Sequence, residues 1–108
     1  MLAKATFFLP LRDNDGRDLS AEQQEVRKRL FDLFDGWTLI GYFEGAFRMQ
    51  DGSQSLDKSA AYMVVLEEGR IGELEDVLRA FKAKTLQEAI YLEVQRGVEF
   101  RFVREELP

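Results

Sequence analysis

The chain has 108 residues, of which 45% are hydrophobic and 32% are charged, and its net charge at pH 7 is −5. This length fits one domain with one core, and the acidic balance disfavours binding to nucleic acids and anionic membranes, which repel negative charge. Cysteine and histidine are both absent, which excludes disulfides, histidine-assisted nucleophiles and the usual ligands of zinc.

The N-terminal segment lacks the hydrophobic region and the cleavage site of a signal peptide, so we interpret it as a strand. No apolar run in the sequence approaches the length needed to cross a bilayer. The absence of cysteine is compatible with the reducing cytosol, and we expect a cytoplasmic protein.

The first strand is predicted over residues 3–11, which are rich in β-branched and aromatic side chains and are expected to be buried on both faces. Residues 12–18 (RDNDGRD) predict a polar loop with a turn at Asp15-Gly16. The loop also invites comparison with a calcium-binding EF-hand. Because Gly16 is fourth from Asp13 and position twelve is Gln24, a solvated turn is favoured.

A helix follows, with Ser20 as its expected N-cap and Gln23 as the capping-box partner. Gly36 is expected to end it in the left-handed conformation. The stripe predicted to face the core consists of Val26, Leu30, Leu33 and Phe34.

From Trp37 the hydrophobic period changes to two, which predicts a long strand over residues 37–49. One face would carry Trp37, Leu39, Gly41, Phe43, Gly45, Phe47 and Met49, and the other Thr38, Ile40, Tyr42, Glu44, Ala46 and Arg48. We expect a bend near Gly41 or Gly45, where glycine interrupts the strand pattern. A hairpin turn at Asp51-Gly52 and a return strand over residues 56–67 complete this part.

The remaining elements are a second helix and two short strands. The helix follows a joint at residues 69–72, and its core stripe is Ile71, Leu74, Val77, Leu78 and Phe81. Strands are predicted over residues 87–94, with Ile90, Leu92 and Val94 on one face, and over residues 98–103. A turn at residues 95–97 separates them, and residues 104–108 form a polar tail.

This order predicts an α+β, ferredoxin-like domain over residues 1–108, β-α-β-β-α-β with an extra C-terminal strand. Both helices should lie on one face of the sheet. Aromatic side chains on the other face exceed what one small sheet can hide, so we expect a homo-oligomer.

The hairpin resembles that of the CutA family of PII-like proteins. The resemblance is carried by Trp37-Thr38, the run Tyr42-Phe43-Glu44-Gly45, the tip Asp51-Gly52 and the later Glu88-Ala89-Ile90, and it covers roughly residues 37–94. It implies a ferredoxin-like trimer whose long hairpins pack between subunits. The cysteine of the CutA second strand has no counterpart here, so thiolate metal binding does not transfer. The chain also resembles a group of small bacterial proteins of unassigned function with the same order of elements.

The candidate site is a polar and aromatic cluster on the hairpin, formed by Tyr42, Glu44, Arg48, Lys58 and Tyr62. Alternation places the first three on one strand face and the last two on one face of the return strand. If the register joins these faces, the cluster is a ligand site or a proton-transfer site with Glu44 as base. The alternative is a set of cross-strand ion pairs and hydrogen bonds at a subunit interface, which we favour.

Two further motifs are weaker. The glycines of Gly41-Tyr42-Phe43-Glu44-Gly45 lack phosphate-loop spacing and lie within a strand, so they more simply bend it. Arg12 and Arg17 have the charge to clamp an anion, but the acidic residues around them favour local ion pairs.

The sequence favours a non-catalytic small-ligand-binding or regulatory module of the PII-like kind, acting as an oligomer, most simply a trimer with a dimer as the alternative. A second hypothesis is a small enzyme of the dimeric α/β-barrel type that uses Glu44, Tyr42 and Arg48. A third is a structural assembly protein. We expect no cofactor, no metal, and no nucleic-acid or membrane partner.

Overall fold

The computed structural model describes residues 1–105, in which four strands and two helices follow the predicted order. They are β1 (Leu2–Pro10), α1 (Ser20–Phe34), β2 (Thr38–Arg48), β3 (Gln54–Glu67), α2 (Ile71–Thr85) and β4 (Leu92–Arg96). One turn of 3-10 helix (Glu68–Arg70) leads into α2. The ferredoxin-like α+β class predicted from the sequence is confirmed.

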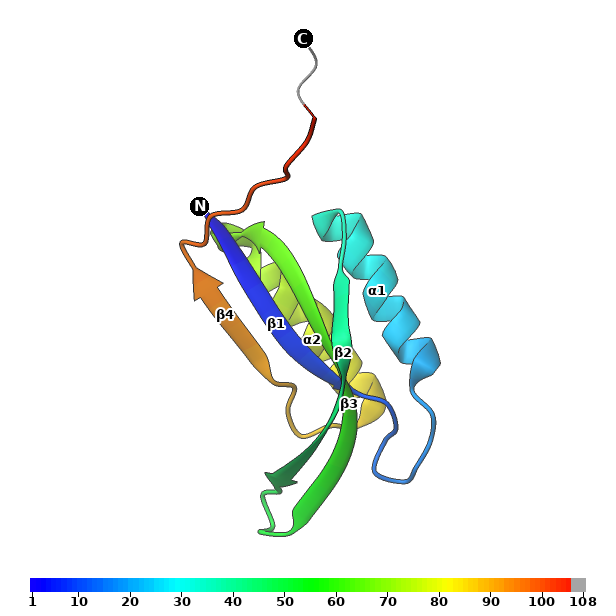
Figure 1. Ribbon diagram of the computed structural model, residues 1–108. Helices are drawn as coiled ribbons and strands as arrows, with labels where there is room; N and C mark the ends of the chain where they lie inside the picture. The colour runs from blue at the N-terminus through cyan, green and yellow to red at the C-terminus, as the bar shows by residue number, and fades with distance from the viewer. Residues whose placement is uncertain (106–108) are drawn as a thin grey trace.

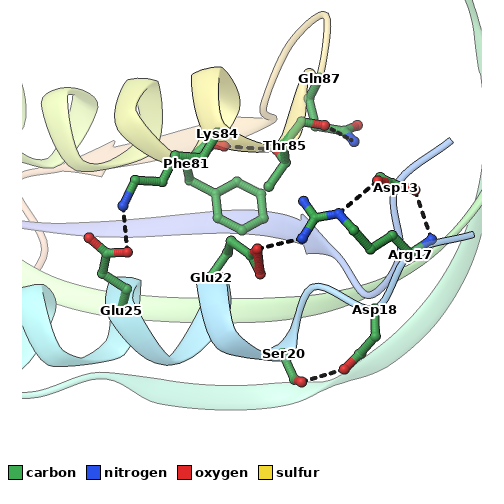
Figure 2. A network of polar contacts seen from close by, with 10 residues as sticks. All are labelled: Asp13, Arg17, Asp18, Ser20, Glu22, Glu25, Phe81, Lys84, Thr85 and Gln87. Carbon is green, nitrogen blue, oxygen red and sulfur yellow. Dashed lines mark hydrogen bonds and ion pairs between the residues drawn. The ribbon is translucent and has the colours of Figure 1, made fainter. Parts of the chain in front are cut away.

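The strands form one antiparallel sheet in the order β2-β3-β1-β4. Each helix therefore connects two strands that have a third strand between them. Figure 1 shows both helices on the same face of the sheet and the other face uncovered. The two helices contact each other, and Lys84 of α2 forms a 2.6 Å ion pair with Glu25 of α1 (Figure 2).

Alternation along the central strands decides which side chains enter the core. The odd-numbered residues of β1 from Ala3 to Leu9 are fully buried beneath the helices. Helix residues that pack on them include Val26, Leu30 and Phe34 of α1 and Leu74, Val77, Leu78 and Phe81 of α2. The alternate residues Lys4, Thr6 and Phe8 are only half-buried. The prediction that the first strand is buried on both faces is therefore wrong for the single chain, because both helices cover the same face.

Both predicted ends of α1 are wrong by one residue. The N-cap is Leu19 without a side-chain cap, and the Ser20 hydroxyl instead donates to Asp18 Oδ2 at 2.5 Å. Gln23 is buried and bonds the backbone of β1, so it does not reach back to complete a capping box. The left-handed residue at the C-terminal end is Asp35 (φ 66°) rather than Gly36, since aspartate tolerates this conformation better than most side chains.

The β2–β3 hairpin extends past the helices (Figure 1). Its turn has Gly52 at φ 87°, and the Met49 N–H donates to the Ser53 carbonyl at 2.8 Å, which confirms the predicted turn. A bulge interrupts the pairing between Leu39 and Gly41, close to one of the two expected bends. The bulge places Leu39 on the helix side together with Tyr42, so the predicted strand faces hold only from Gly41 onward.

The last strand starts later than predicted. Residues 87–91 run irregularly beside β1, and the Phe8 N–H donates to the Tyr91 carbonyl at 3.3 Å before regular pairing begins at Leu92. Ile90, Leu92 and Val94 pack against the core as expected.

After Gly97 (φ 67°) the chain turns away from the sheet (Figure 1). Residues 98–105 pair with no strand of the described chain, although the sequence predicts a further strand at residues 98–103. Of the predicted polar tail, residues 106–108 lie outside the described residues. Among residues 1–105, no helix has the length and apolarity required to cross a membrane.

Candidate functional site

A chain of hydrogen bonds connects the core to the surface between α1 and β2. Tyr62 is fully buried, and its hydroxyl donates to Gln23 Oε1 at 2.7 Å. Gln23 Nε2 donates to the carbonyl oxygens of Pro10 (2.8 Å) and Leu9 (3.3 Å), so the buried amide uses both of its ends. On the outer side, Arg27 Nε donates to the Tyr62 hydroxyl at 2.9 Å. Burial raises the pKa of Tyr62 against the opposing effect of Arg27, so this hydroxyl stays protonated at neutral pH.

Aromatic rings hold the Arg27 guanidinium in place. Its central carbon lies 4.7 Å from the centroid of the Trp37 ring and 5.5 Å from that of Tyr62, where a cation is attracted to the π face. The Trp37 and Tyr62 rings meet edge to face with centroids 6.0 Å apart. The two Nη groups of Arg27 have no hydrogen-bond partner among the described residues, so they remain available as donors.

The loop before α1 is closed by its own hydrogen bonds. Arg12 and Asp18 form an isolated antiparallel bridge, and Asp13 Oδ1 accepts the Arg17 N–H at 2.8 Å. The Arg17 side chain bonds Asp13 Oδ2 at 3.2 Å and Glu22 Oε1 at 2.7 Å (Figure 2). The backbone bond from Arg17 lowers the pKa of Asp13, and the side-chain bond from Arg17 lowers the pKa of Glu22. The loop therefore forms a fixed wall beside α1.

These elements enclose a hollow of about 390 Å³, which we call the α1–β2 groove. It is lined by Leu11, Arg12, Asp18, Ser20, Gln23, Gln24, Arg27 and Tyr42. Its volume lies in the range of pockets that hold small organic molecules. Two arginines against one aspartate make the groove locally positive in a chain whose net charge is −5.

The structure separates the five residues of the predicted cluster. The hairpin register does place them on the same side of the sheet, with Glu44 directly opposite Lys58. Tyr42, which is 65% exposed, lines the α1–β2 groove, whereas Tyr62 is buried beside the groove residues Gln23 and Arg27. Glu44 and Lys58 form an exposed ion pair of 3.6 Å further along the hairpin. Arg48, near the tip, donates to the Gly52 carbonyl at 3.3 Å.

The two arginines of the loop behave differently from each other. Arg17 forms the local ion pairs that were expected, with Asp13 and Glu22. Arg12 donates from Nη1 to the Gly16 carbonyl at 3.0 Å and forms no ion pair within the described residues. An anion clamp that uses both side chains is therefore ruled out, because Arg17 is already neutralised.

A second hollow of about 310 Å³ opens on the other face of the sheet, between the hairpin and residues 87–91. The Phe8 ring stacks on Tyr91 and meets Phe43 edge to face, with both centroid distances at 4.5 Å. The Gln50 N–H donates to Glu88 Oε2 at 3.3 Å and ties the hairpin to this segment. The hollow is bounded by aromatic side chains on the uncovered face of the sheet.

In the part of the chain that the structure describes, no group of three or more carboxylates is placed to hold a metal ion. The Asp13 carboxylate accepts the N–H groups of Asp15 and Arg17 and the Arg17 side chain, so its oxygens stabilise the loop. This agrees with the interpretation of residues 13–18 as a solvated turn.

No protein-family model and no curated protein matches the sequence. Solved structures match the fold. The divalent cation tolerance protein Cut A1 of Thermus thermophilus superposes with a TM-score of 0.68 at 14% identity, over 94% of this chain and 88% of that chain. CutA1 of Ehrlichia chaffeensis superposes with a TM-score of 0.61 at 6% identity, over 93% and 84%. The chain has the CutA fold. The resemblance drawn from the hairpin is thus confirmed for the fold.

A phage SAM lyase in its apo state shares this fold with a TM-score of 0.65 at 16% identity, over 86% of this chain and 78% of that chain. The fold is therefore found in a lyase as well as in CutA proteins, so it does not by itself decide between a binding protein and an enzyme.

Sequence reasoning missed Gln23 and Arg27, which lie at the centre of the groove. Gln23 had a signal, because it lies three residues before Val26 and seven before Leu30, on the buried stripe of α1. A polar side chain on such a stripe needs a buried partner, which here is the hydroxyl of Tyr62. Arg27 had no such signal, since its contacts come from elements that are distant in sequence.

Proposed function

We propose that the protein is a non-catalytic small-ligand-binding or regulatory module of the PII-like kind that acts as a homo-oligomer. The observation that carries this proposal is the α1–β2 groove, whose walls are held by contacts within the chain. Tyr62 and Trp37 hold Arg27, and the bonds of Asp13 hold the loop. Fixed walls favour binding because few side chains lose freedom when a ligand enters.

The oligomer would cover the face of the sheet that the helices leave open. This face carries half-buried apolar side chains, among them Phe8, Phe43, Met63 and Val65. A second copy of the chain would remove them from water. We propose a trimer, the state that the CutA resemblance implies, with a dimer as the alternative.

Within the predicted cluster, we propose that Tyr42 contacts the ligand and that buried Tyr62 supports the groove. Glu44, Lys58 and Arg48 lie further along the hairpin, on the side opposite Phe43. Because a hairpin that packs between subunits is covered on both sides, we propose that these residues also meet a neighbouring subunit. Because the Glu44–Lys58 pair is exposed, Glu44→Gln should leave the stability of the isolated chain almost unchanged. A change in the subunit dissociation constant of that variant would support the interface role, and an unchanged constant would contradict it.

The experiment measures thermal unfolding of the full chain against a panel of soluble metabolites. We expect at least one compound to raise the melting temperature of the native protein and to raise that of Tyr42→Ala less. Chromatography of the same mixture should recover the compound unchanged. A compound that is consumed would contradict the non-catalytic proposal.

The second candidate is an enzyme, since one of the structures that share this fold is a phage SAM lyase. Incubation of the native protein with SAM, followed by chromatography, tests this candidate directly. Under the first proposal the SAM concentration stays equal to that in a protein-free control. Turnover that is lost in Tyr42→Ala would establish the second candidate.

Two of the proteins that share this fold are divalent cation tolerance proteins, but this chain has neither histidine nor cysteine. We therefore predict that zinc and copper leave the melting temperature unchanged at micromolar concentration, because the sequence lacks their preferred ligands. A steep rise that a chelator reverses would contradict this prediction.

A further inference from the structure

Arg27 is held on several sides without a negative partner. Its Nε bonds the neutral hydroxyl of Tyr62, and its guanidinium lies over the ring of Trp37. Within the described residues, no carboxylate oxygen lies within 4.0 Å of its nitrogens. A half-buried cation in a fixed position is normally paired, so the two free Nη groups offer a place for an anion.

Arg12 is the second cation of the α1–β2 groove, and it too forms no ion pair in the described chain. The only acidic side chain in the lining is Asp18, whose Oδ2 already accepts the Ser20 hydroxyl at 2.5 Å. One carboxylate cannot neutralise two guanidinium groups. The groove therefore keeps a positive charge although the chain as a whole is acidic.

We propose that the α1–β2 groove binds the oxyanion group of a small organic molecule, either a carboxylate or a phosphate, with Arg27 as its principal ligand and Arg12 as the second. This inference rests on the proposed function and names the ligand class of the same groove. The paired Nη groups of an arginine match two oxygens of either anion. The volume of about 390 Å³ leaves room for an organic part beside the exposed ring of Tyr42.

A purely structural role for Arg27 makes a different prediction. In that case the side chain would only cover the rings of Trp37 and Tyr62, as long basic side chains do at the edges of cores. Its replacement would lower stability, but the protein would bind no anion at this position. Binding and stability must therefore be measured separately.

The test is calorimetric titration of the full chain with inorganic pyrophosphate and, separately, with citrate, which represent the two anion sources. We expect at least one probe to bind, with an affinity that falls as salt is added. Arg27→Gln should weaken this binding about tenfold or more. Arg29→Gln removes the same charge from the same helix, but Arg29 does not line the groove. The affinity of this control variant for the probe should therefore stay within about twofold of the native value.

Arg12→Gln is the second variant, because its only side-chain hydrogen bond in the described chain is with the Gly16 carbonyl at the surface. It should fold normally and weaken binding several-fold, which keeps the test valid if Arg27→Gln unfolds. Failure of both probes to bind the native chain would overturn the inference, as would equal losses in Arg27→Gln and Arg29→Gln. A monomer that binds pyrophosphate through Arg27 would refute only the oligomeric function, whereas an oligomer stabilised by other metabolites alone would refute only this inference.

Discussion

The hydroxyl of Tyr62 is the point at which the core meets the α1–β2 groove. It donates to Gln23 and accepts from Arg27, so one buried oxygen orders both side chains. We predict that Tyr62→Phe lowers the free energy of unfolding by about 1–3 kcal/mol, because Gln23 Oε1 loses its buried donor. Urea denaturation measures the change. Tyr42→Phe is the control, since the exposed Tyr42 hydroxyl has no hydrogen-bond partner among the described residues. Equal urea denaturation midpoints for Tyr62→Phe and Tyr42→Phe would contradict the prediction.

Asp13 links the stability of the loop to pH. The bond from the Arg17 N–H is the largest cause that lowers its pKa, so the folded state holds the proton less tightly than the unfolded chain does. The stabilisation is therefore present above the unfolded pKa of about 4 and is lost as the pH falls through the lower pKa of the folded state. We predict that the difference in unfolding free energy between the native protein and Asp13→Ala narrows from pH 7 to pH 3.

Asp32→Ala provides the control, because Asp32 lies on the exposed side of α1 and forms no hydrogen bond in the described chain. The difference in unfolding free energy between Asp32→Ala and the native protein should change less over the same pH range. If the difference in unfolding free energy between the native protein and Asp13→Ala stays constant down to pH 3, the Asp13 carboxylate does not stabilise the loop.

At the scale of elements, both long helices end on a side chain in the left-handed conformation. Leu86 ends α2 with φ 56° and is 85% exposed, so it loses little apolar contact on replacement. Leucine is strained in this conformation whereas glycine is not. We predict that the free energy of unfolding of Leu86→Gly exceeds that of Leu86→Ala by about 1 kcal/mol, so that Leu86→Gly unfolds at a higher temperature. Thermal denaturation of the two variants tests this prediction. If residue 86 lay inside the helix, the alanine variant would instead have the higher melting temperature.

The hydrophobic period predicted the elements, whereas their ends and their contacts depend on tertiary structure. The stripes of α1 and α2 and the alternation of β3 were readable because burial repeats along the sequence. The predicted capping box of Ser20 and Gln23 does not form, because the Gln23 amide donates to the Pro10 carbonyl of β1. This contact joins two elements and cannot be read from the local sequence. Tyr42, whose role in binding stays a prediction, was singled out by its strand position. Arg27 was not, because its contacts with Trp37 and Tyr62 are between elements.

At the scale of the whole molecule, the uncovered face of the sheet should determine self-association. A Cβ atom added to Gly45 would lie 3.0 Å from the Phe47 ring, so Gly45→Val should displace that ring on the open face. We predict that native protein scatters light as an oligomer and that the Gly45→Val variant shifts toward the monomer mass of 12.5 kDa while its circular dichroism is retained. A native monomer at micromolar concentration would contradict the oligomer. A variant that unfolds while its folded fraction keeps the native mass would contradict the role of the hairpin.

The bulge between Leu39 and Gly41 has a consequence for how this hairpin can change during evolution. Side chains on a strand alternate between the faces, so one residue more or fewer reverses every position that follows. The bulge accommodates the extra residue Ile40, so that Tyr42 stays on the side of the groove and Phe43 on the open face. Deletion of Ile40 would therefore remove only the bulge and leave these sides unchanged, whereas the loss of one residue from the regular part of β2 would require a new irregularity to keep them.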